Sequence, residues 1–164
     1  MADLFSRYLD TNGDGTGTKN ANGDYSSAEG IFYLAPGENE VFALSRMLIS
    51  AYDTNGMQTQ EYGNTAAALT NGIAIRISDN NGIVSDLTDG ITIKNNGQWG
   101  AFCFDVDVKS WGSGNELLVA RWTFAKSGAP IRLAGKVGEK LEVVLNDDLT
   151  GLITHYFIVQ GLKY

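Results

Sequence analysis

The sequence predicts an all-β protein, in which a single β-sandwich (jelly-roll) domain follows an extended irregular N-terminal arm. Three observations predict this fold: short apolar runs recur along most of the chain, turn-forming residues separate them, and no amphipathic helical pattern connects them. The 20 glycines against two prolines also indicate many tight turns. The polar, aperiodic start of the chain gives way to this pattern near residue 29. We therefore assign residues 1–28 to the arm and residues 29–164 to the domain.

Alternation of apolar and polar residues locates the strands of the domain. Residues 73–78 place three isoleucines at alternate positions, and residues 102–108 place two aspartates opposite a row of apolar side chains. The apolar run 41–51 is long enough for a helix, but its serines and β-branched residues favour a strand. The expected strands cover residues 31–34, 41–51, 73–78, 91–93, 102–108, 117–124, 131–133, 140–145 and 153–161.

Turn residues between these runs fit hairpins. Asn-Gly pairs supply the positive backbone angles that a tight hairpin needs. Only residues 59–69 could form a short helix, which Gly63 and Asn64 would weaken. Strands at this spacing predict a sandwich, a jelly roll or a barrel. The turn segments are residues 53–56, 79–82, 95–97 and 146–148.

The composition of the chain excludes several classes of function. The 164 residues carry a net charge of -7 and a pI of about 4.6, which does not suit a protein that binds the nucleic-acid backbone. A single cysteine and a single histidine exclude an internal disulfide, a cysteine-rich metal site and a site with two histidines. No apolar run reaches the roughly 18–20 residues of a membrane span, and the N-terminus lacks the pattern of a signal peptide. We therefore expect a chain made in a cytoplasm, without nucleic-acid or membrane partners.

The arm contains the first half of a calcium-loop pattern. Asp10, Asn12 and Asp14 alternate and a glycine follows them, so their side-chain oxygens could converge on a hard cation. The second half is missing, because Ala21 stands where the pattern needs a glutamate, although Asp24 could replace that ligand. We predict a polar connection without a metal ion or other cofactor. Asp10, Asn12 and Asp14 remain the candidate ligands should a cation bind.

Neither the histidine nor the cysteine has the partners that nucleophilic catalysis requires. His155 shares its alternation phase with Ile153 and Phe157, which places it toward the core as a structural residue. Cys103 stands between two phenylalanines and faces away from them. No Gly-x-Ser-x-Gly motif is present. We predict structural roles for both residues and no catalytic residue in the chain.

Two pairs of carboxylates leave a small hydrolase as an alternative. Asp105 and Asp107 share one face of a predicted strand, and their spacing could suit the two acids of a glycoside hydrolase. Asp147 and Asp148 form the second pair. Aspartates on the solvent face of a half-buried strand need no catalytic explanation, so we expect the chain not to be an enzyme.

Aromatic residues leave a carbohydrate-binding module as another alternative. They make up 10% of the chain, and their ring faces can stack on the apolar faces of sugars. Trp99 and Trp111 lie beside glycines in predicted loops, which favours exposure, whereas Trp122 lies in a predicted strand and belongs to the core. The candidate glycan-stacking residues are therefore Trp99 and Trp111, with Tyr25, Tyr52 and Tyr62 as further members of the platform.

Three stretches of the sequence together resemble a family of viral structural proteins. The first reads LFSRYLD at residues 4–10, with DGTGT at 14–18 and GDY at 23–25. The second reads LTNGI at residues 69–73, and the third reads NDDLTGL at 146–152 and leads into HYF at 155–157. In this pattern, which spans most of the chain, the sequence resembles the capsid cement (decoration) proteins of tailed bacteriophages, which have a jelly-roll body. Fibre and neck components of virions resemble it in the same way.

The resemblance implies a non-enzymatic virion protein that is made in the host cytoplasm and acts on the capsid surface. It also implies a homotrimer that binds the major capsid protein and bridges neighbouring shell subunits. An arm suits such a clamp, because it can order on a neighbour while the body stays folded. Apolar arm residues should pack on the body or on a partner. The candidate interface residues are Leu4, Phe5, Tyr8, Leu9 and Tyr25.

Overall fold

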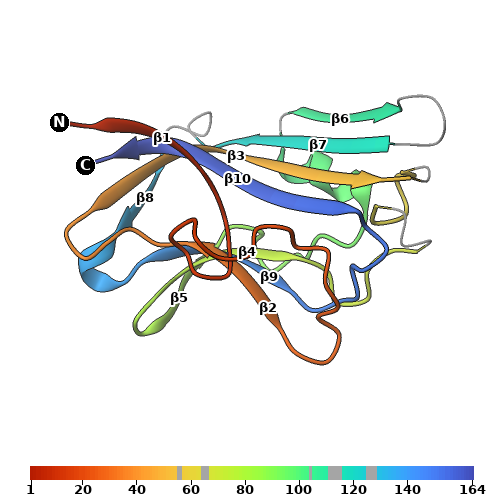
Figure 1. The fold of residues 1–164 in the computed structure, drawn as a ribbon, viewed down its shortest axis with the longest axis horizontal. Helices are drawn as coiled ribbons and strands as arrows, with labels where there is room; N and C mark the ends of the chain where they lie inside the picture. Colours follow the sequence, from red (N-terminus) through yellow and green to blue (C-terminus); the bar gives the residue numbers. More distant parts are fainter. Residues whose placement is uncertain (55–56, 64–66, 104, 111–115, 125–128) are drawn as a thin grey trace.

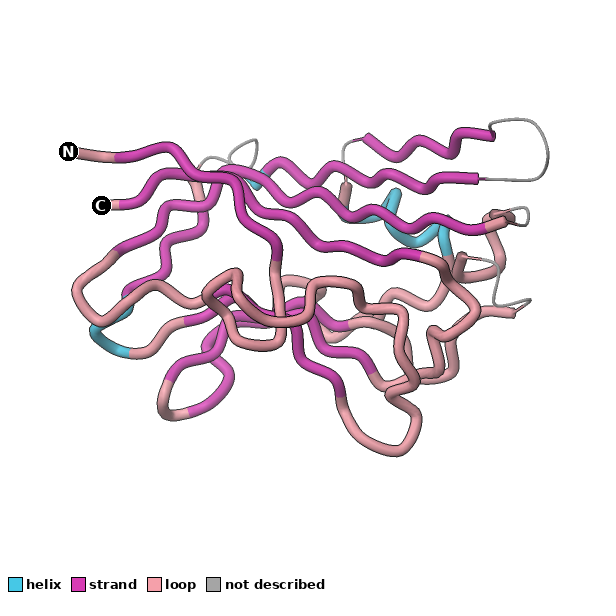
Figure 2. The backbone as a smooth tube through the Cα atoms, viewed as in Figure 1, coloured by secondary structure: helices cyan, strands magenta, loops and turns pink. Residues whose placement is uncertain are grey.

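Two antiparallel β-sheets packed against each other form the chain, which confirms the predicted all-β sandwich (Figure 1). The structure is a computed structural model that describes residues 1–54, 57–63, 67–103, 105–110, 116–124 and 129–164. We call the upper layer of Figure 1 sheet A and the lower layer sheet B. Figure 2 shows long strands running through the upper layer and loops surrounding the shorter strands of the lower layer.

Sheet A is built around two long neighbouring strands, β3 (Val41–Asp53) and β10 (Thr154–Lys163). Their pairing contains a bulge, because Ser45 of β3 has no partner between Gln160 and Gly161 of β10. The Ser45 hydroxyl donates a hydrogen bond of 3.0 Å to the backbone carbonyl of Gln160. The remaining strands are β1 (Asp3–Tyr8) beside β10, β7 (Glu116–Thr123) and β6 (Asp105–Ser110) beyond β3, and β8 (Ile131–Ala134), which pairs with the start of β3.

Sheet B follows the order β2-β9-β4-β5. The N-terminal segment covers its β2 edge, because Asp10 and Tyr33 exchange two backbone hydrogen bonds of 3.2 and 2.9 Å. Short helical segments lie in the connections between strands. The bounds are β2 (Gly30–Leu34), β9 (Lys140–Leu145), β4 (Ala74–Asp79) and β5 (Gly82–Asp86) for the sheet, and η1 (Asn96–Gln98), α1 (Trp99–Phe102) and η3 (Gly135–Val137) for the helical segments.

The antiparallel strand pairs are nested in the sequence. β1 pairs with β10, β2 with β9, β3 with β8, and β4 with β5. The chain therefore forms one long two-stranded ribbon whose successive pairs alternate between sheet A and sheet B. The β6–β7 hairpin stands outside this order and widens sheet A beside β3.

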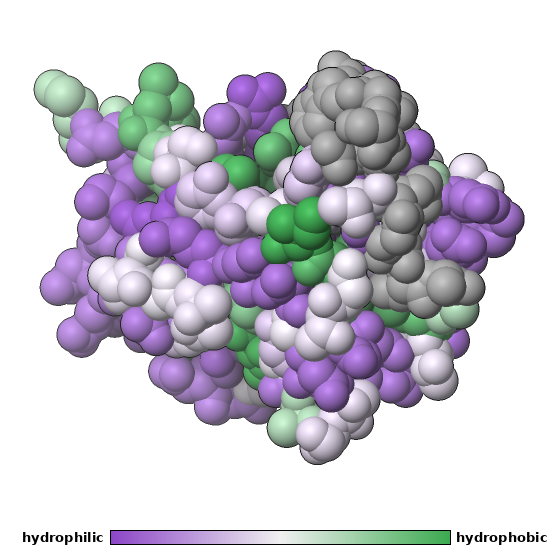
Figure 3. Space-filling model, turned by 45° about the vertical axis from the view of Figure 1, so that its right-hand side comes forward, coloured by the Kyte–Doolittle hydropathy of each residue, from purple (hydrophilic) through white to green (hydrophobic). Residues whose placement is uncertain are grey.

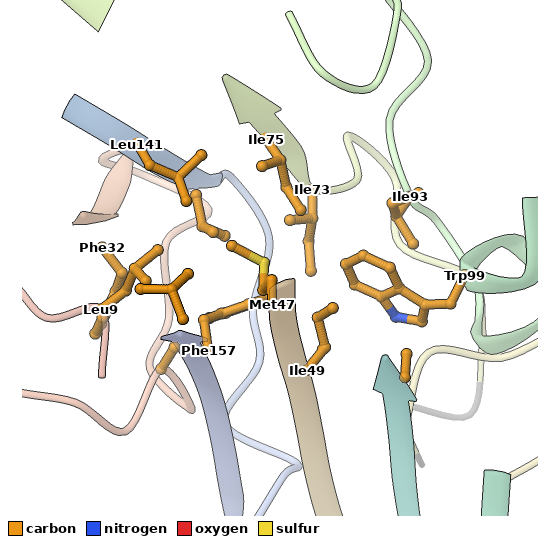
Figure 4. Packing of buried hydrophobic residues seen from close by; sticks show 14 of the residues in the cluster. Leu9, Phe32, Met47, Ile49, Ile73, Ile75, Ile93, Trp99, Leu141 and Phe157 are labelled. Atoms are coloured by element: carbon orange, nitrogen blue, oxygen red, sulfur yellow. The ribbon is translucent and has the colours of Figure 1, made fainter. Parts of the chain in front are cut away.

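Alternate side chains of the two sheets fill the space between them. On β3 the inward positions change from even to odd numbers across the bulge, so Leu44 and Met47 are both buried. Each fully buried large apolar side chain contributes about 1.5–3 kcal/mol relative to exposure. Figure 4 shows this contact, with Met47, Ile49 and Phe157 of sheet A against Ile75 and Leu141 of sheet B.

The N-terminal residues differ from the predicted irregular arm. Residues 3–8 form strand β1, which pairs with β10 along its whole length. The inward-facing ring of Phe5 lies 4.7 Å from the ring of Phe42, and Leu9 is completely buried. The prediction is therefore wrong for residues 3–8, because the partner of this short strand lies at the other end of the sequence. Irregular structure begins after β1, in a loop that packs on the sandwich.

Other elements also differ from the sequence prediction. Residues 99–102 form α1, so the strand expected over 102–108 begins only at Asp105. Residues 91–93 contribute a single bridge to Ile73 in place of a strand. No helix occurs in the described part of residues 59–69. Strand β5 was not predicted, because all of its residues are exposed and carry no burial pattern. The structure confirms strands at 31–34, 41–51, 73–78, 117–124, 131–133, 140–145 and 153–161.

Candidate functional site

Asp10, the first candidate cation ligand, organises the loop that follows β1. Its carboxylate is completely buried and accepts hydrogen bonds from the backbone N–H groups of Asn12, Gly13 and Gly17 at 3.2, 2.5 and 2.7 Å. Gly13 has a φ of 77°, and the ring of Tyr33 occupies the place of a side chain there. The carboxylate therefore satisfies backbone donors that folding removes from water.

Asp14, the other acidic candidate, serves a turn of the same loop. Its Oδ1 accepts hydrogen bonds from the backbone N–H and the hydroxyl of Thr16 at 2.9 and 2.6 Å, and these bonds lower the pKa of the Asp14 carboxyl. The Asn12 side-chain amide donates a hydrogen bond of 3.1 Å to the Thr16 hydroxyl. Asp24 forms an equivalent turn, in which its Oδ1 accepts hydrogen bonds from the backbone N–H and the hydroxyl of Ser26. Within the described ranges, no three Asp, Glu, His or Cys side chains gather as a metal ion would need. The candidate ligands are thus engaged by the loop itself.

Asp147 joins two loops that are far apart in the sequence. Its side chain is buried and accepts hydrogen bonds from the backbone N–H groups of Thr70, Asn71 and Gly72 at 2.9, 3.1 and 2.8 Å. The side-chain amide of Asn71 donates a hydrogen bond of 2.8 Å to the backbone carbonyl of Asn146. Two of the stretches that carry the family resemblance, LTNGI and NDDLTGL, therefore form the two halves of one contact.

The buried pair of His155 and Tyr62 joins β10 to the chain that follows β3. Both side chains are fully buried, and the Tyr62 hydroxyl lies 2.8 Å from His155 Nε2. Burial lowers the pKa of His155 to about 3 and raises the pKa of Tyr62, so both are neutral at pH 7. The backbone of His155 also binds the N-terminal loop through Asn20 and Ala21, at 2.9 and 2.8 Å. The prediction that His155 faces the core is confirmed.

Cys103 lies in surroundings that suppress thiol reactivity. The residue is buried, and burial raises the pKa of its thiol to about 12. The thiolate, which is the nucleophilic form, is therefore scarce at neutral pH. This position agrees with the structural thiol predicted from the sequence.

The structure contradicts the assignment of Trp99 to a glycan-stacking platform. Trp99 begins α1 and is 0% exposed, with its ring turned into the core (Figure 4). A neighbouring glycine favoured an exposed loop, but the large apolar area of the ring is buried instead. Tyr62 is buried as well, and Trp122 packs against the core as expected. Trp111 lies outside the described residues, so its assignment stays a prediction.

The carboxylate pair of Asp105 and Asp107 lies on β6, an edge strand of sheet A. The strand register pairs these residues with Arg121 and Val119 of β7, and it places Asp107 on the side of the sheet that faces away from sheet B. Asp107 is half-buried and takes part in an interaction, while the side chain of Asp105 lies outside the described part of the chain. Asp148 accepts hydrogen bonds within its own turn. The hydrolase alternative stays a prediction.

The predicted interface residues divide into exposed and buried ones. Leu4 is 87% exposed and Tyr8 is 38% exposed, both on the outward side of β1. Phe5 and Tyr25 are half-buried against the core. Leu9 is fully buried, so its assignment to an interface is wrong. The chain turns inward after β1 and carries Leu9 between the sheets, where it fills the core.

Sequence reasoning missed one surface, which we call the outer face of sheet A. It consists of the side chains of β1, β10, β3, β7 and β8 that point away from sheet B. Directly paired residues share a face, so the register places Leu4 beside Leu162, and Ile158 between Tyr8 and Leu48. These side chains come from strands distant in sequence. In the sequence, this face could have been recognised from the apolar residues at the outward positions of the alternating strands.

A groove of about 840 Å³ opens on this face, at the end where both termini lie (Figure 1). Its walls are mainly apolar and come from β1, β3, β10 and the end of β7, with one residue before β8 and one after β10. Figure 3 shows a few hydrophobic side chains among hydrophilic ones at this end of the molecule, at the upper left of the view. The apolar lining residues include Leu4, Phe5, Ala43, Pro130, Leu162 and Tyr164.

Comparisons with protein-family models, with curated proteins and with solved structures found no match to this chain. Across the described ranges, no helix has the length and apolar character needed to cross a membrane. The surfaces and side chains described above are therefore the basis for inferring its function.

Proposed function

We propose that the chain is a non-enzymatic structural protein of a phage virion, a capsid decoration protein that binds the major capsid protein and stabilises the shell. The proposal starts from the resemblance carried by the three sequence stretches. The observation that supports it most is the apolar outer face of sheet A, where Leu4 is 87% exposed. Exposed apolar surface beside a groove is typical of a protein contact site.

The side chains that could perform chemistry serve the fold instead. Asp10 and Asp147 accept hydrogen bonds from backbone donors, and His155 and Cys103 are buried. A general acid, base or nucleophile must reach its substrate within hydrogen-bond distance. These positions favour a binding protein over an enzyme that would use these four residues.

The nested strand pairs support the jelly-roll form of the proposal. A jelly roll is a two-sheet antiparallel architecture of eight strands. The pairs β1–β10, β2–β9, β3–β8 and β4–β5 supply eight strands that alternate between two sheets. The β6–β7 hairpin is then an addition to this body.

We further propose that the chain acts as a homotrimer on the shell. Free strand edges favour association, because their N–H and C=O groups have no partner within the sheet. β5 forms one edge of sheet B, and its Ile83 and Val84 are 63% and 53% exposed. Natural edge strands are commonly protected by charge, which β5 lacks before Asp86.

Co-sedimentation with phage heads tests the proposed function. Heads of the encoding virus that lack this protein are mixed with the purified chain, and bound protein is measured against concentration. We expect saturable binding of the wild-type chain, about tenfold weaker for Leu4→Asp, since a charge would replace an apolar contact. Val137→Asp is the matched control, because Val137 is also exposed but lies in η3.

Absence of wild-type binding to the heads contradicts the proposal. A bound stoichiometry that is not a multiple of three, together with a monomeric mass by light scattering, contradicts the trimer. Deletion of residues 1–28 is unsuitable as a test, because it removes β1 and the buried residues Leu9 and Ala21.

A further inference from the structure

The outer face of sheet A differs in charge from the protein as a whole. The chain has 19 acidic and 12 basic residues, a net charge of -7. Strands β1, β10, β3, β7 and β8 are fully described, and none of their outward positions holds an aspartate or a glutamate. On this side of sheet A the carboxylate of Asp107 lies beyond these strands, on the edge strand β6. Three outward positions hold arginine, at Arg46, Arg121 and Arg132. This face is therefore both apolar and basic on an acidic protein.

Arg46 and Arg132 lack the ion pairs found on the opposite side of the sandwich. On the outward side of sheet B, Arg76 lies 2.8 Å from Glu142 and 4.0 Å from Glu29. Among the residues that the structure describes, no carboxylate lies within 4.0 Å of the Arg46 or Arg132 guanidinium. Both arginines are exposed. Their charge is thus available to a partner.

Arg46 lies at the apolar groove. Its Nε donates a hydrogen bond to the side-chain oxygen of Gln160, and both side chains line the groove. A second hollow of about 330 Å³ continues from Arg46 along Leu48 and Ile158 to Arg121. The positive charge therefore lies between two apolar hollows on one continuous face.

We propose that the outer face of sheet A binds an acidic and apolar segment of a partner protein. Apolar side chains of the segment fill the groove, and its carboxylates accept hydrogen bonds from Arg46 and Arg132. The apolar contact supplies affinity, while the guanidinium–carboxylate pairs set orientation and speed association. The inference rests on the proposed function for the identity of the partner, which is then the capsid protein.

Charge disfavours two other occupants of this face. Two copies packed through β1, β10, β3 and β8 about a two-fold axis would bring Arg46 and Arg132 of both copies to one interface, where the outward positions of these strands supply no carboxylate. A nucleic-acid backbone would meet the arginines but also the net charge of -7 of the whole chain. An acidic protein segment avoids the repulsion between arginines, because it brings carboxylates to them. Its apolar side chains also fill the groove.

Fluorescence anisotropy with two labelled peptides tests this inference. One peptide alternates glutamate with leucine and phenylalanine, and the other replaces every glutamate with glutamine. We expect the acidic peptide to bind about tenfold more tightly than its amide counterpart, with an affinity that falls as salt rises. Arg46→Glu and Arg132→Glu should each weaken the acidic peptide about fivefold to tenfold and leave the amide peptide unchanged.

Two matched variants separate specific from general effects. Lys136→Glu makes the same change of charge in η3, outside this face, and should not alter the affinity for either peptide. Leu162→Asp alters the groove and should weaken both peptides. Circular dichroism and thermal unfolding of each variant establish that it is folded.

Equal binding of the two peptides, or an equal loss in Lys136→Glu, would overturn the inference. Competition by an oligonucleotide as strong as that by the acidic peptide would overturn it as well. An oligomeric mass that Arg46→Glu reduces would assign the face to a second copy. If the peptides behave as expected but phage heads do not bind, the proposed function fails alone. If heads bind the wild type and Arg46→Glu equally, the inference fails alone.

Discussion

At the scale of single residues, buried polar side chains hold the loops onto the two sheets. Asp10 serves the loop after β1, Asp147 the loop before β4, and the His155 ring contacts the Tyr62 hydroxyl. Each of these side chains belongs to a type that catalysis and metal binding also use. Their partners in this fold are backbone groups or buried side chains, so their energetic effect should appear in stability.

Replacing Asp147 tests this structural role. Asp147→Ala leaves the backbone N–H groups of Thr70, Asn71 and Gly72 without their acceptor. We expect a loss of about 3 kcal/mol in the free energy of unfolding, because bonds to a charged acceptor are strong and buried donors are costly to leave unpaired. Urea denaturation measures this loss. Asp148→Ala is the control, and a similar loss in both variants would contradict the clamp.

His155 should make stability depend on pH. Burial holds its pKa at about 3, below the value of about 6.5 in an unfolded chain. The unfolded state therefore takes up a proton first as the pH falls, and stability declines from about pH 6.5 by about 1.4 kcal/mol per pH unit until the pH reaches the folded pKa. The stability that depends on neutral His155 is therefore fully present only above about pH 6.5.

His155→Gln isolates the effect of the histidine. Urea unfolding at pH 7 and pH 5 should show that the wild type loses about 2 kcal/mol more than the variant over this range. The carboxylates titrate in both proteins and cancel in the comparison. Equal losses would mean that His155 is accessible to protons in the folded state.

The sequence predicted single residues only where alternation determines their direction. The phase of β10 placed His155 inward, as the structure confirms. The direction of Trp99 could not be predicted in this way, because a neighbouring glycine does not determine whether the indole ring is buried in the core. The roles of Asp10 and Asp147 depend on backbone donors in turns, and for Asp147 these lie more than 70 residues away. Such contacts leave no periodic pattern.

At the scale of elements, the sequence predicted strands with buried alternate residues and missed strands at the edges. β3 and β10 bury every second side chain against the other sheet, which produces a readable pattern. β1 and β5 have a neighbour on one side only, and neither strand contains a fully buried residue. The outer face of sheet A was missed for a related reason, since it forms only when β1 and β10 meet.

Strand β1 should depend on its inward ring. Phe5→Ala removes the contact with Phe42 and should cost about 1–2 kcal/mol, less than a fully buried phenylalanine would. Hydrogen exchange should accelerate at the β10 amides that face β1. Leu4→Ala is the control, because Leu4 is 87% exposed and should change stability by less than about 0.5 kcal/mol. Equal effects would contradict the register of β1.

At the scale of the whole molecule, charge and apolar surface are unevenly distributed. An acidic chain keeps repeated copies soluble, while the exposed Arg46 and Arg132 on the outer face of sheet A can attract an acidic partner. The outer face of sheet A also carries the groove beside both termini. The uneven distribution suits attachment to a large assembly, since a single face makes the contact and the acidic remainder stays in water.

Hydroxyl-radical footprinting of the chain, free and bound to phage heads, tests whether the outer face of sheet A contacts the capsid. We expect binding to protect the exposed side chains of Leu4, Tyr8 and Tyr164, which lie at the outer face of sheet A or line its groove. Val137 and Ile153, which are exposed elsewhere, should react equally in both states. Protection of Val137 and Ile153 with unchanged labelling of Leu4 and Tyr8 would contradict it.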